Sequence, residues 1–173
     1  MNFNIRAATR EDCKDISRMI LELALYEKMT DQVKISCEEL EHDGFCQNPL
    51  FECVVAEVPE ENKSREGFTI VGYGLYFYTY STWKGRAMHL EDLYVMPEFR
   101  GIGIGKCLMS TVAKVAKENH CALLQLNVLE WNTPSRDFYA TRGGQDLTVQ
   151  EGWHLIRFDG QSLDDLGNDG PKN

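Results

Sequence analysis

The sequence lacks any long hydrophobic run. No stretch approaches the ~20 consecutive apolar residues that a membrane-spanning helix requires, although 43% of the 173 residues are apolar. Residues 1–10 are polar and charged, where a secretory signal would carry an apolar segment. We therefore expect neither a membrane protein nor a secreted one, but a cytoplasmic protein.

The sequence also lacks paired cysteines. None of its six cysteines belongs to a C-x-x-C pair, and none has a histidine nearby at the spacing of metal ligands. We expect reduced, half-buried side chains and no metal site. The cysteines are Cys13, Cys37, Cys46, Cys53, Cys107 and Cys121.

An excess of basic residues is absent as well. The chain has 18 Lys and Arg against 27 Asp and Glu, for a net charge of −9. This balance argues against nucleic acid as a partner. A negative surface would suit a cationic small molecule, although it can also simply keep a protein soluble.

The length permits one sizeable core and is short for two ordinary domains. We expect a single domain over residues 1–167 and a disordered tail over 168–173, with no internal repeat. Apolar periodicity and turn signals predict strands, helices and one antiparallel hairpin in a mixed order. This order favours an α/β layered domain with a mostly antiparallel sheet. Strands are expected at 3–7, 51–58, 69–80, 87–95, 123–129 and 153–159, and helices after Thr9, after Ser36, after the glycine-rich stretch and at 132–142.

The stretch EFRGIGIGKCLM, residues 98–109, holds three glycines in five positions between a strand and a helix. Such a turn exposes backbone N–H groups that suit a pyrophosphate, although a plain tight turn is the alternative. The dinucleotide motif G-x-G-x-x-G does not fit, because Lys106 or Leu108 stands at the third glycine. The P-loop motif fails too, because Cys107 follows Gly105-Lys106.

The spacing Arg100-x-x-Gly103-x-Gly105 resembles the pyrophosphate loop of the GNAT family of N-acetyltransferases. The segments HLEDLYVMPEFRGIGIG and LNVLEWNTPSRDFYATRGG extend the resemblance to the diamine acetyltransferases, over most of residues 4–159. DQVKIS and YSTWKGR are similar to the thialysine N-epsilon-acetyltransferase branch, the sister of the spermidine/spermine N1-acetyltransferases. The resemblance implies the GNAT acyl-CoA N-acyltransferase fold, acetyl-CoA as cosubstrate and a homodimer.

Acetyl transfer to an amine requires the amine in its neutral form. An alkylammonium has a pKa near ~10.4, so at pH 7 its protonation is a handicap of about 4–5 kcal/mol. Glu91 and Asp92 are candidate carboxylates, but in a regular strand they point to opposite faces unless a bulge intervenes. The resemblance implies that Glu91 contacts the substrate and draws its proton through water. The role of Asp92 stays open.

The resemblance also implies the other site residues. Tyr139 would donate a proton to the coenzyme thiolate, although a tyrosine on an amphipathic helix usually packs in a core. Arg100 would brace the glycine loop. Carboxylates at 27, 91 and 151 would form an acidic trough for a cation. The acceptor residues are Tyr26, Glu27, Glu91, Gln125, Leu126, Asn127 and Glu151; the coenzyme residues are Leu93, Tyr94, Val95, Gly101, Ile102, Gly103, Ile104, Gly105, Lys106, Asn132, Thr133, Pro134 and Ser135.

The expected function is therefore acetyl transfer from acetyl-CoA to a primary amine of a small molecule, by direct attack in a ternary complex. The acceptor would be thialysine, a related lysine-like amine or a short polyamine. Ser81 stands where polyamine-acetylating relatives often carry an acid, which argues against long polyamines. Trp83 would either stack on a ligand of the partner chain or pack ordinarily. Alternatives are a spermidine/spermine acetyltransferase, a protein-lysine acetyltransferase and a non-catalytic CoA-binding module.

Overall fold

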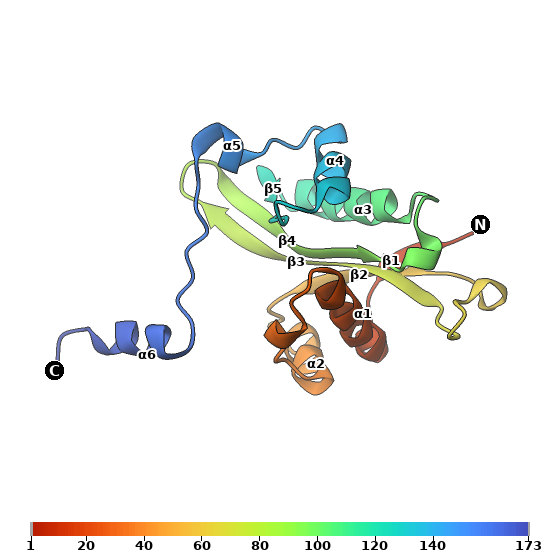
Figure 1. Cartoon of the computed structure of the whole chain (residues 1–173), viewed down its shortest axis with the longest axis horizontal. Helices are drawn as coiled ribbons and strands as arrows, with labels where there is room; N and C mark the ends of the chain where they lie inside the picture. The colour runs from red at the N-terminus through yellow and green to blue at the C-terminus, as the bar shows by residue number, and fades with distance from the viewer. Residues whose placement is uncertain (1, 173) are drawn as a thin grey trace. The chain divides into compact units, whose positions relative to one another are not determined.

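The computed structural model describes residues 2–172, which form two compact units that divide between Asn127 and Val128. The first unit contains a five-stranded sheet with three helices, and the second contains three helices (Figure 1). The elements of the first are β1 (Asn4–Ala7), α1 (Cys13–Tyr26), α2 (Cys37–Phe45), β2 (Glu52–Glu57), β3 (Ile70–Ser81), β4 (Gly85–Val95), α3 (Ile104–Glu118) and β5 (Leu123–Gln125). Those of the second are α4 (Thr133–Thr141), α5 (Leu147–Glu151) and α6 (Gly160–Asn168).

The strands of the sheet follow the order of the chain, β1-β2-β3-β4-β5. The first four pair antiparallel, and β3 and β4 form the long hairpin that the sequence predicts. β5 pairs parallel to β4, because the chain crosses over through α3 before it returns to the sheet. The sheet is mixed and mostly antiparallel, as predicted.

Helices cover both faces of this sheet. α1 and α2 lie on one face and α3 on the other (Figure 1). α3 approaches β3 closely at Gly72, where an added Cβ would lie 3.2 Å from the Leu108 side chain and 2.9 Å from the Tyr94 carbonyl oxygen. A bare backbone at Gly72 therefore sets how near α3 can pack.

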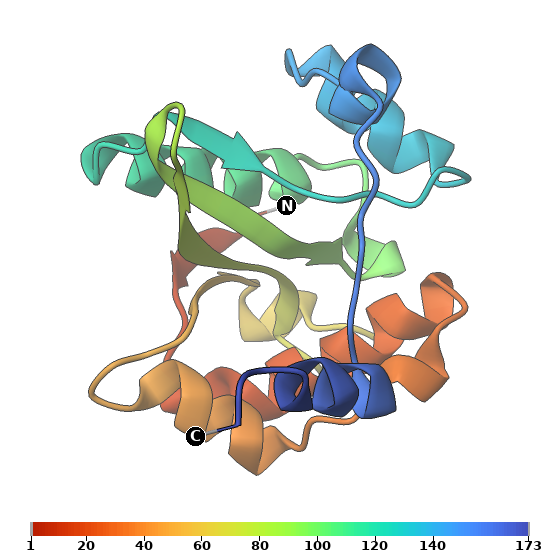
Figure 2. The ribbon, with the colours of Figure 1, turned by 90° about the vertical axis from the view of Figure 1, so that its left-hand side faces the viewer.

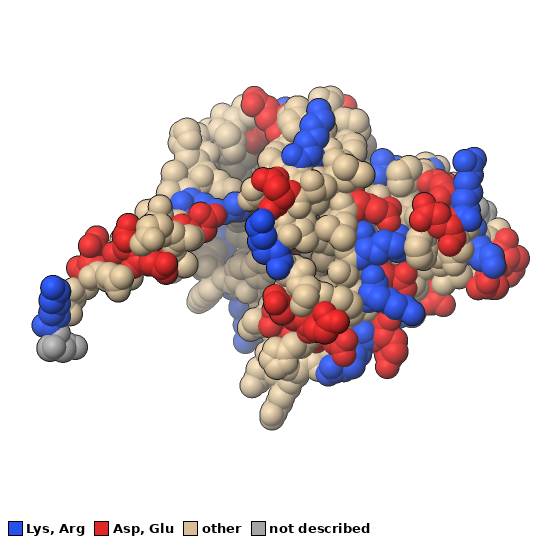
Figure 3. Space-filling view, turned by 60° about the horizontal axis from the view of Figure 1, so that its bottom comes forward, with Lys and Arg blue, Asp and Glu red and all other residues tan. Residues whose placement is uncertain are grey.

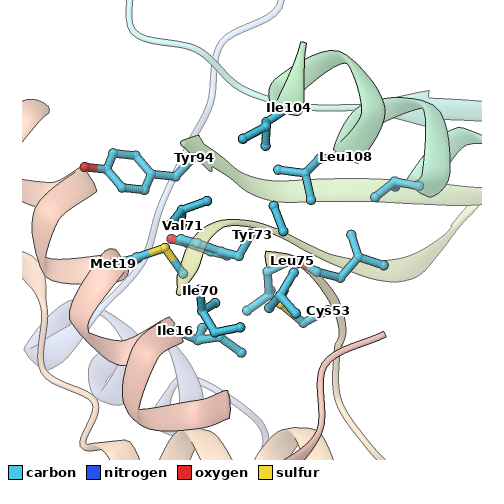
Figure 4. Packing of buried hydrophobic residues seen from close by; sticks show 14 of the residues in the cluster. Ile16, Met19, Cys53, Ile70, Val71, Tyr73, Leu75, Tyr94, Ile104 and Leu108 are labelled. Carbon is cyan, nitrogen blue, oxygen red and sulfur yellow. Dashed lines mark hydrogen bonds between the residues drawn. The ribbon is translucent and has the colours of Figure 1, made fainter. Parts of the chain in front are cut away.

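The core lies between the sheet and these helices. Figure 4 shows Ile16 and Met19 of α1 reaching toward Tyr73 from one side, and Ile104 and Leu108 of α3 packing on the other. All five side chains are fully buried. Burial of a large apolar side chain contributes ~1.5–3 kcal/mol, so this double layer holds β3 and β4 firmly in place.

Local signals fix the helix starts. The Ser36 hydroxyl oxygen accepts a hydrogen bond from the Glu39 N–H at 3.0 Å, which confirms the predicted start of α2. Before α1, the Asp12 carboxylate accepts from the Thr9 N–H at 2.7 Å. Asp12 also pairs with Arg6, with Nη1 and Oδ2 2.7 Å apart. This pair ties β1 to the beginning of the first helix.

The predicted last strand, 153–159, is wrong. Residues 153–159 pair with no strand within 2–172, and α6 follows them (Figure 2). The predicted strand 123–129 is also shorter, since β5 ends at Gln125. A strand needs a partner, and apolar alternation in a segment does not supply one. The apolar side chains Trp153, Leu155, Ile156 and Phe158 are 54–74% exposed.

Candidate active site

The glycine-rich stretch forms the turn between β4 and α3. Gly101 and Gly103 have φ of +84° and +95°, a left-handed conformation that favours glycine. Gly105 lies within the first turn of α3. The Cys107 N–H donates to the Gly103 carbonyl at 3.0 Å, which leaves the N–H groups of residues 104–106 without an acceptor inside the helix. The turn therefore offers a row of donors to an anion.

Arg100 braces this turn. Its Nε donates to the Val95 carbonyl at 2.8 Å, and its guanidinium lies 5.6 Å from the centroid of the Tyr94 ring and 5.7 Å from that of Tyr26. The Tyr94 hydroxyl donates to Glu22 at 3.0 Å. Burial, and then the Glu22 carboxylate, raise the pKa of Tyr94 to about 12. These contacts tie the end of β4 to α1.

β5, the edge strand of the sheet, pairs with only part of β4. Ala87, Met88 and His89 pair with residues 123–125, and then β5 ends while β4 continues to Val95. Among residues 2–172, no strand pairs with this edge of β4 beyond His89. An open strand edge can bind an extended ligand through its backbone groups. Leu93, Tyr94 and Val95 lie on this open stretch.

A β-bulge decides where the two candidate carboxylates point. Leu75 pairs with Asp92 and Tyr76 with Leu90, so Glu91 is an extra residue on β4. Asp92 therefore shares the face of Leu75, which is the face that α1 covers. The side chain of Glu91 lies on the same face, because it contacts His89 there. The bulge brings both carboxylates to one side, which a regular strand would not.

Three carboxylates gather on this face of the first unit. Asp92 is largely buried and accepts from the Tyr73 hydroxyl at 2.7 Å. Burial and the nearby Glu91 raise the pKa of Asp92, while the Tyr73 hydrogen bond opposes the rise. Burial, Asp92 and then Glu91 likewise raise the pKa of Glu27, which follows α1. Acids held this close repel one another, and a bound cation would relieve the repulsion.

His89 contacts this cluster and was not predicted as a site residue. Its Nε2 lies 3.2 Å from Oε2 of Glu91, and its ring lies 5.2 Å from that of Phe77. The sequence contains the signal, because residues two apart on a strand share a face. His89 and Glu91 have that spacing.

The second unit carries the predicted residues in and beside α4. Asn132 caps α4 by accepting from the Ser135 N–H at 3.4 Å, and Thr133 and Pro134 begin the helix. Tyr139 is half-buried on α4, with its ring edge-on to Phe138 at 5.4 Å. α4 itself confirms the predicted helix within one residue at each end.

Glu151, the third acid of the predicted trough, ends α5 in the second unit and accepts from Trp153 Nε1 at 2.7 Å. The structure thus brings Glu27 and Glu91 together, with Asp92 as the third acid of their cluster. Glu151 instead holds the side chain of Trp153.

The other acceptor residues lie at the ends of elements. Tyr26 is the last residue of α1 and is exposed. Gln125 closes β5, and Leu126 and Asn127 follow it. In the β3–β4 turn, the Ser81 hydroxyl accepts from the Lys84 N–H at 3.0 Å. Ser81 therefore stabilises the turn.

Other surface features of residues 2–172 are an exposed tryptophan, a hollow and the distribution of charge. Trp83 in the β3–β4 turn is 81% exposed. A shallow hollow near the start of β1 contains none of the predicted site residues; it is lined by Asn2, Phe3, Asn4, Glu57, Val58 and Pro59. Acidic and basic side chains are interspersed on the face drawn in Figure 3, so the net charge does not gather there into one acidic patch.

Two further observations concern metals and membranes. Within residues 2–172 no three or more His, Cys, Asp or Glu side chains are grouped as metal ligands would be. No helix in that range combines the length and apolar character that crossing a bilayer requires.

The sheet is mixed, β5 pairs with only part of β4, and a glycine turn joins β4 to α3. This arrangement indicates the acyltransferase class. The chain belongs to the Acetyltransferase (GNAT) family, whose model matches residues 20–143. It is an acetyltransferase. This confirms the resemblance noted in the sequence.

Curated relatives place the chain within that family. It is 51% identical to the thialysine N-epsilon-acetyltransferase of Bos taurus over 162 residues, which cover 94% of this chain and 95% of the relative. It is 40% identical to the spermidine/spermine N(1)-acetyltransferase-like protein 1 of Homo sapiens, over 95% of this chain and 24% of that protein.

A solved structure supports the fold. An integron cassette protein of V. cholerae matches with a TM-score of 0.76 and 24% identity, over 98% of this chain and 99% of that one. At this identity the likeness shows the fold alone. It confirms the predicted α/β class with the GNAT arrangement.

Proposed function

We propose that the protein transfers the acetyl group of acetyl-CoA to the primary amine of a small, lysine-like molecule such as thialysine. The observation that carries the proposal is the turn at Gly101 and Gly103, whose left-handed glycines lead into the free N–H groups of α3. This is a seat for a diphosphate, which CoA carries. The 51% identity to a thialysine N-epsilon-acetyltransferase supports the choice of acceptor.

The open edge of β4 supports the path of the coenzyme. We propose that the thioester arm lies along Leu93, Tyr94 and Val95, where β5 has ended. Backbone N–H groups there would polarise the thioester carbonyl as negative charge develops on its oxygen. Ile102, Ile104, Gly105 and Lys106 would surround the diphosphate, and the start of α4 from Asn132 to Ser135 would contact the same coenzyme.

The acidic cluster supports a cationic acceptor. We propose that Glu27, Glu91 and Asp92 bind the ammonium group. Burial first, and repulsion between the acids second, raise the pKa of Glu27 and of Asp92, and a bound cation would relieve the repulsion. Tyr26, Gln125, Leu126, Asn127 and Glu151 would complete the acceptor site. The ammonium first loses a proton to a water held by Glu91, and the neutral amine then attacks the thioester carbon directly. A C–N bond forms and the C–S bond breaks. The Tyr139 hydroxyl gives its proton to the leaving thiolate, and the proton that the amide nitrogen loses restores the Tyr139 hydroxyl.

The proposal also covers the extent of the domain, the compartment and the oligomeric state. One acetyltransferase domain would extend over residues 1–167, since the family model crosses the division at Asn127. The protein would act in the cytoplasm, and its six free cysteines fit a reducing compartment. It would act as a homodimer, in which the exposed apolar row Trp153, Leu155, Ile156 and Phe158 is buried against a second copy.

An acceptor panel tests the function. Thialysine, spermidine and a lysine peptide are offered at equal concentration with acetyl-CoA, and products are identified by their mass shift. We expect thialysine to react fastest, and Tyr139→Phe to lower turnover while the heat of CoA binding stays unchanged. Faster reaction of spermidine or the peptide would show that the proposed acceptor is wrong. CoA binding without transfer to any amine would indicate a non-catalytic binding module. If CoA gave no binding heat, the proposed enzyme activity would be wrong.

A further inference from the structure

His89 and Glu91 make a contact on β4 that the acceptor site does not by itself require. The Glu91 carboxylate oxygen Oε2 lies 3.2 Å from Nε2 of His89. The two side chains differ in exposure. That of Glu91 is 55% exposed, whereas that of His89 is 19% exposed. Glu91 can meet a ligand, and His89 lies behind it.

The position of His89 in the sheet is fixed on both sides. It pairs with Phe77 on β3 and with Gln125 on β5, and it is the last residue of β4 before the two strands part. Its ring packs against Phe77 at 5.2 Å. The imidazole therefore lies at the point where the pairing of β4 with β5 ends, beside the stretch of β4 where the thioester arm is proposed to lie.

The charged groups near His89 are carboxylates on its own face of the sheet. Glu91 is the charged group that faces it on its own strand, and Asp92 follows on the same face. The partners on β3 and β5, Phe77 and Gln125, do not titrate. Beyond Glu91 lies Glu27 of the α1 end, which senses the Glu91 charge. α3 packs on the opposite face.

Deprotonation of the substrate ammonium favours a stronger base than a carboxylate. An alkylammonium in water has a pKa near ~10.4, a glutamate ~4.3 and an imidazole ~6.5. The pKa difference between the ammonium and an imidazole is therefore about two units smaller than that between the ammonium and a carboxylate, so transfer of the proton to an imidazole costs less. Glu91 is well placed to hold the ammonium, but it is a weak final base.

We propose that His89 takes up, through Glu91, the proton that the acceptor ammonium must lose before it attacks. The N–H bond of the ammonium breaks and its proton passes through water to the Glu91 carboxylate, which leaves the lone pair on the amine. The proton then moves from Glu91 to Nε2 of His89, and the imidazolium releases it to water after the transfer. His89 acts through Glu91, so it is a positioning residue. This inference rests on the proposed function.

The test is the ratio of kcat/KM between wild type and His89→Gln as a function of pH. An ordinary imidazole carries its proton at about pH 5.5 and cannot accept a second one, so the ratio should approach one there. Toward about pH 8.5 the ratio should rise to ~10-fold or more. A merely structural role would give the same ratio at every pH. His42→Gln, an exposed histidine of α2, is the matched control and should keep a ratio of one throughout.

The outcomes separate this inference from the proposed function. An active wild type whose ratio to His89→Gln does not change with pH would overturn the role of His89 alone. A wild type that transfers no acetyl group would overturn the proposed function itself. His89→Asn serves as a second variant, and the acetyl-CoA binding heat of both variants shows that they are folded. Partial rescue of His89→Ala by added imidazole would support the proton transfer.

Discussion

At the scale of single residues, the ion pair between Arg6 and Asp12 is expected to stabilise the fold. The Asp12 side chain is 8% exposed. Burial alone would raise the pKa of Asp12, but hydrogen bonds from Arg6 and from the Thr9 N–H outweigh burial and hold the pKa below its ordinary value. A lowered carboxyl pKa contributes stability that is present above the pKa of the unfolded chain and is lost as the pH falls through the folded value.

We predict that Asp12→Asn lowers the free energy of unfolding by ~1–3 kcal/mol at about pH 7. The neutral amide replaces the carboxylate that pairs with Arg6, so the ion pair is lost. The difference from wild type should shrink below about pH 4. Urea unfolding followed by circular dichroism measures both. Glu11→Gln, the exposed neighbour, is the control and should change little. A difference that persists unchanged into acid would contradict the argument.

Individual residues also show where sequence reasoning stops. The spacing of Arg100, Gly103 and Gly105 predicts the turn, and the structure confirms its conformation. The facing of Glu91 and Asp92 could not be predicted, because the bulge depends on how β4 registers with β3 and not on the β4 sequence. Periodicity names the candidate carboxylates, and pairing decides where they point.

At the scale of elements, the turn before α3 depends on its left-handed glycines. We predict that Gly103→Ala weakens acetyl-CoA binding about tenfold, because a side chain in this conformation costs ~1–2 kcal/mol and the turn relaxes away from it. Gly167→Ala makes the same chemical change inside α6, where the φ is not positive, and should leave affinity unaltered. Calorimetry with acetyl-CoA compares the two. Equal affinities would show that the turn does not bind the coenzyme.

Elements with a strong pattern and a local partner were predicted best. The β3–β4 hairpin and α4 match their expected ranges closely, since a turn or a cap fixes each one nearby in sequence. The segment at residues 153–159 is also rich in apolar residues, but its own residues do not specify a pairing partner. The helices α5 and α6 are short or amphipathic with exposed leucines, and their signal was too weak to predict.

At the scale of the whole molecule, the exposed row at residues 153–158 predicts the assembly. We expect the wild type to sediment at twice its chain mass of 19.8 kDa. Ile156→Glu combined with Phe158→Glu should give single chains, because burying such side chains contributes ~1.5–3 kcal/mol each and charges would forfeit it. Leu50→Glu, an equally exposed apolar residue of the first unit, should stay dimeric. A wild type that sediments as one chain would remove the homodimer.

The early end of β5 would have a consequence for the life of the protein in the cell if the proposed coenzyme site is correct. From Leu90 to Val95 the fourth strand has an edge that β5 does not pair with, and a ligand that bound there in the folded chain alone would raise its melting temperature. The abundance of the protein would then follow the supply of its acetyl donor. A chain starved of that donor would be cleared faster, so its own turnover would report the metabolic state around it.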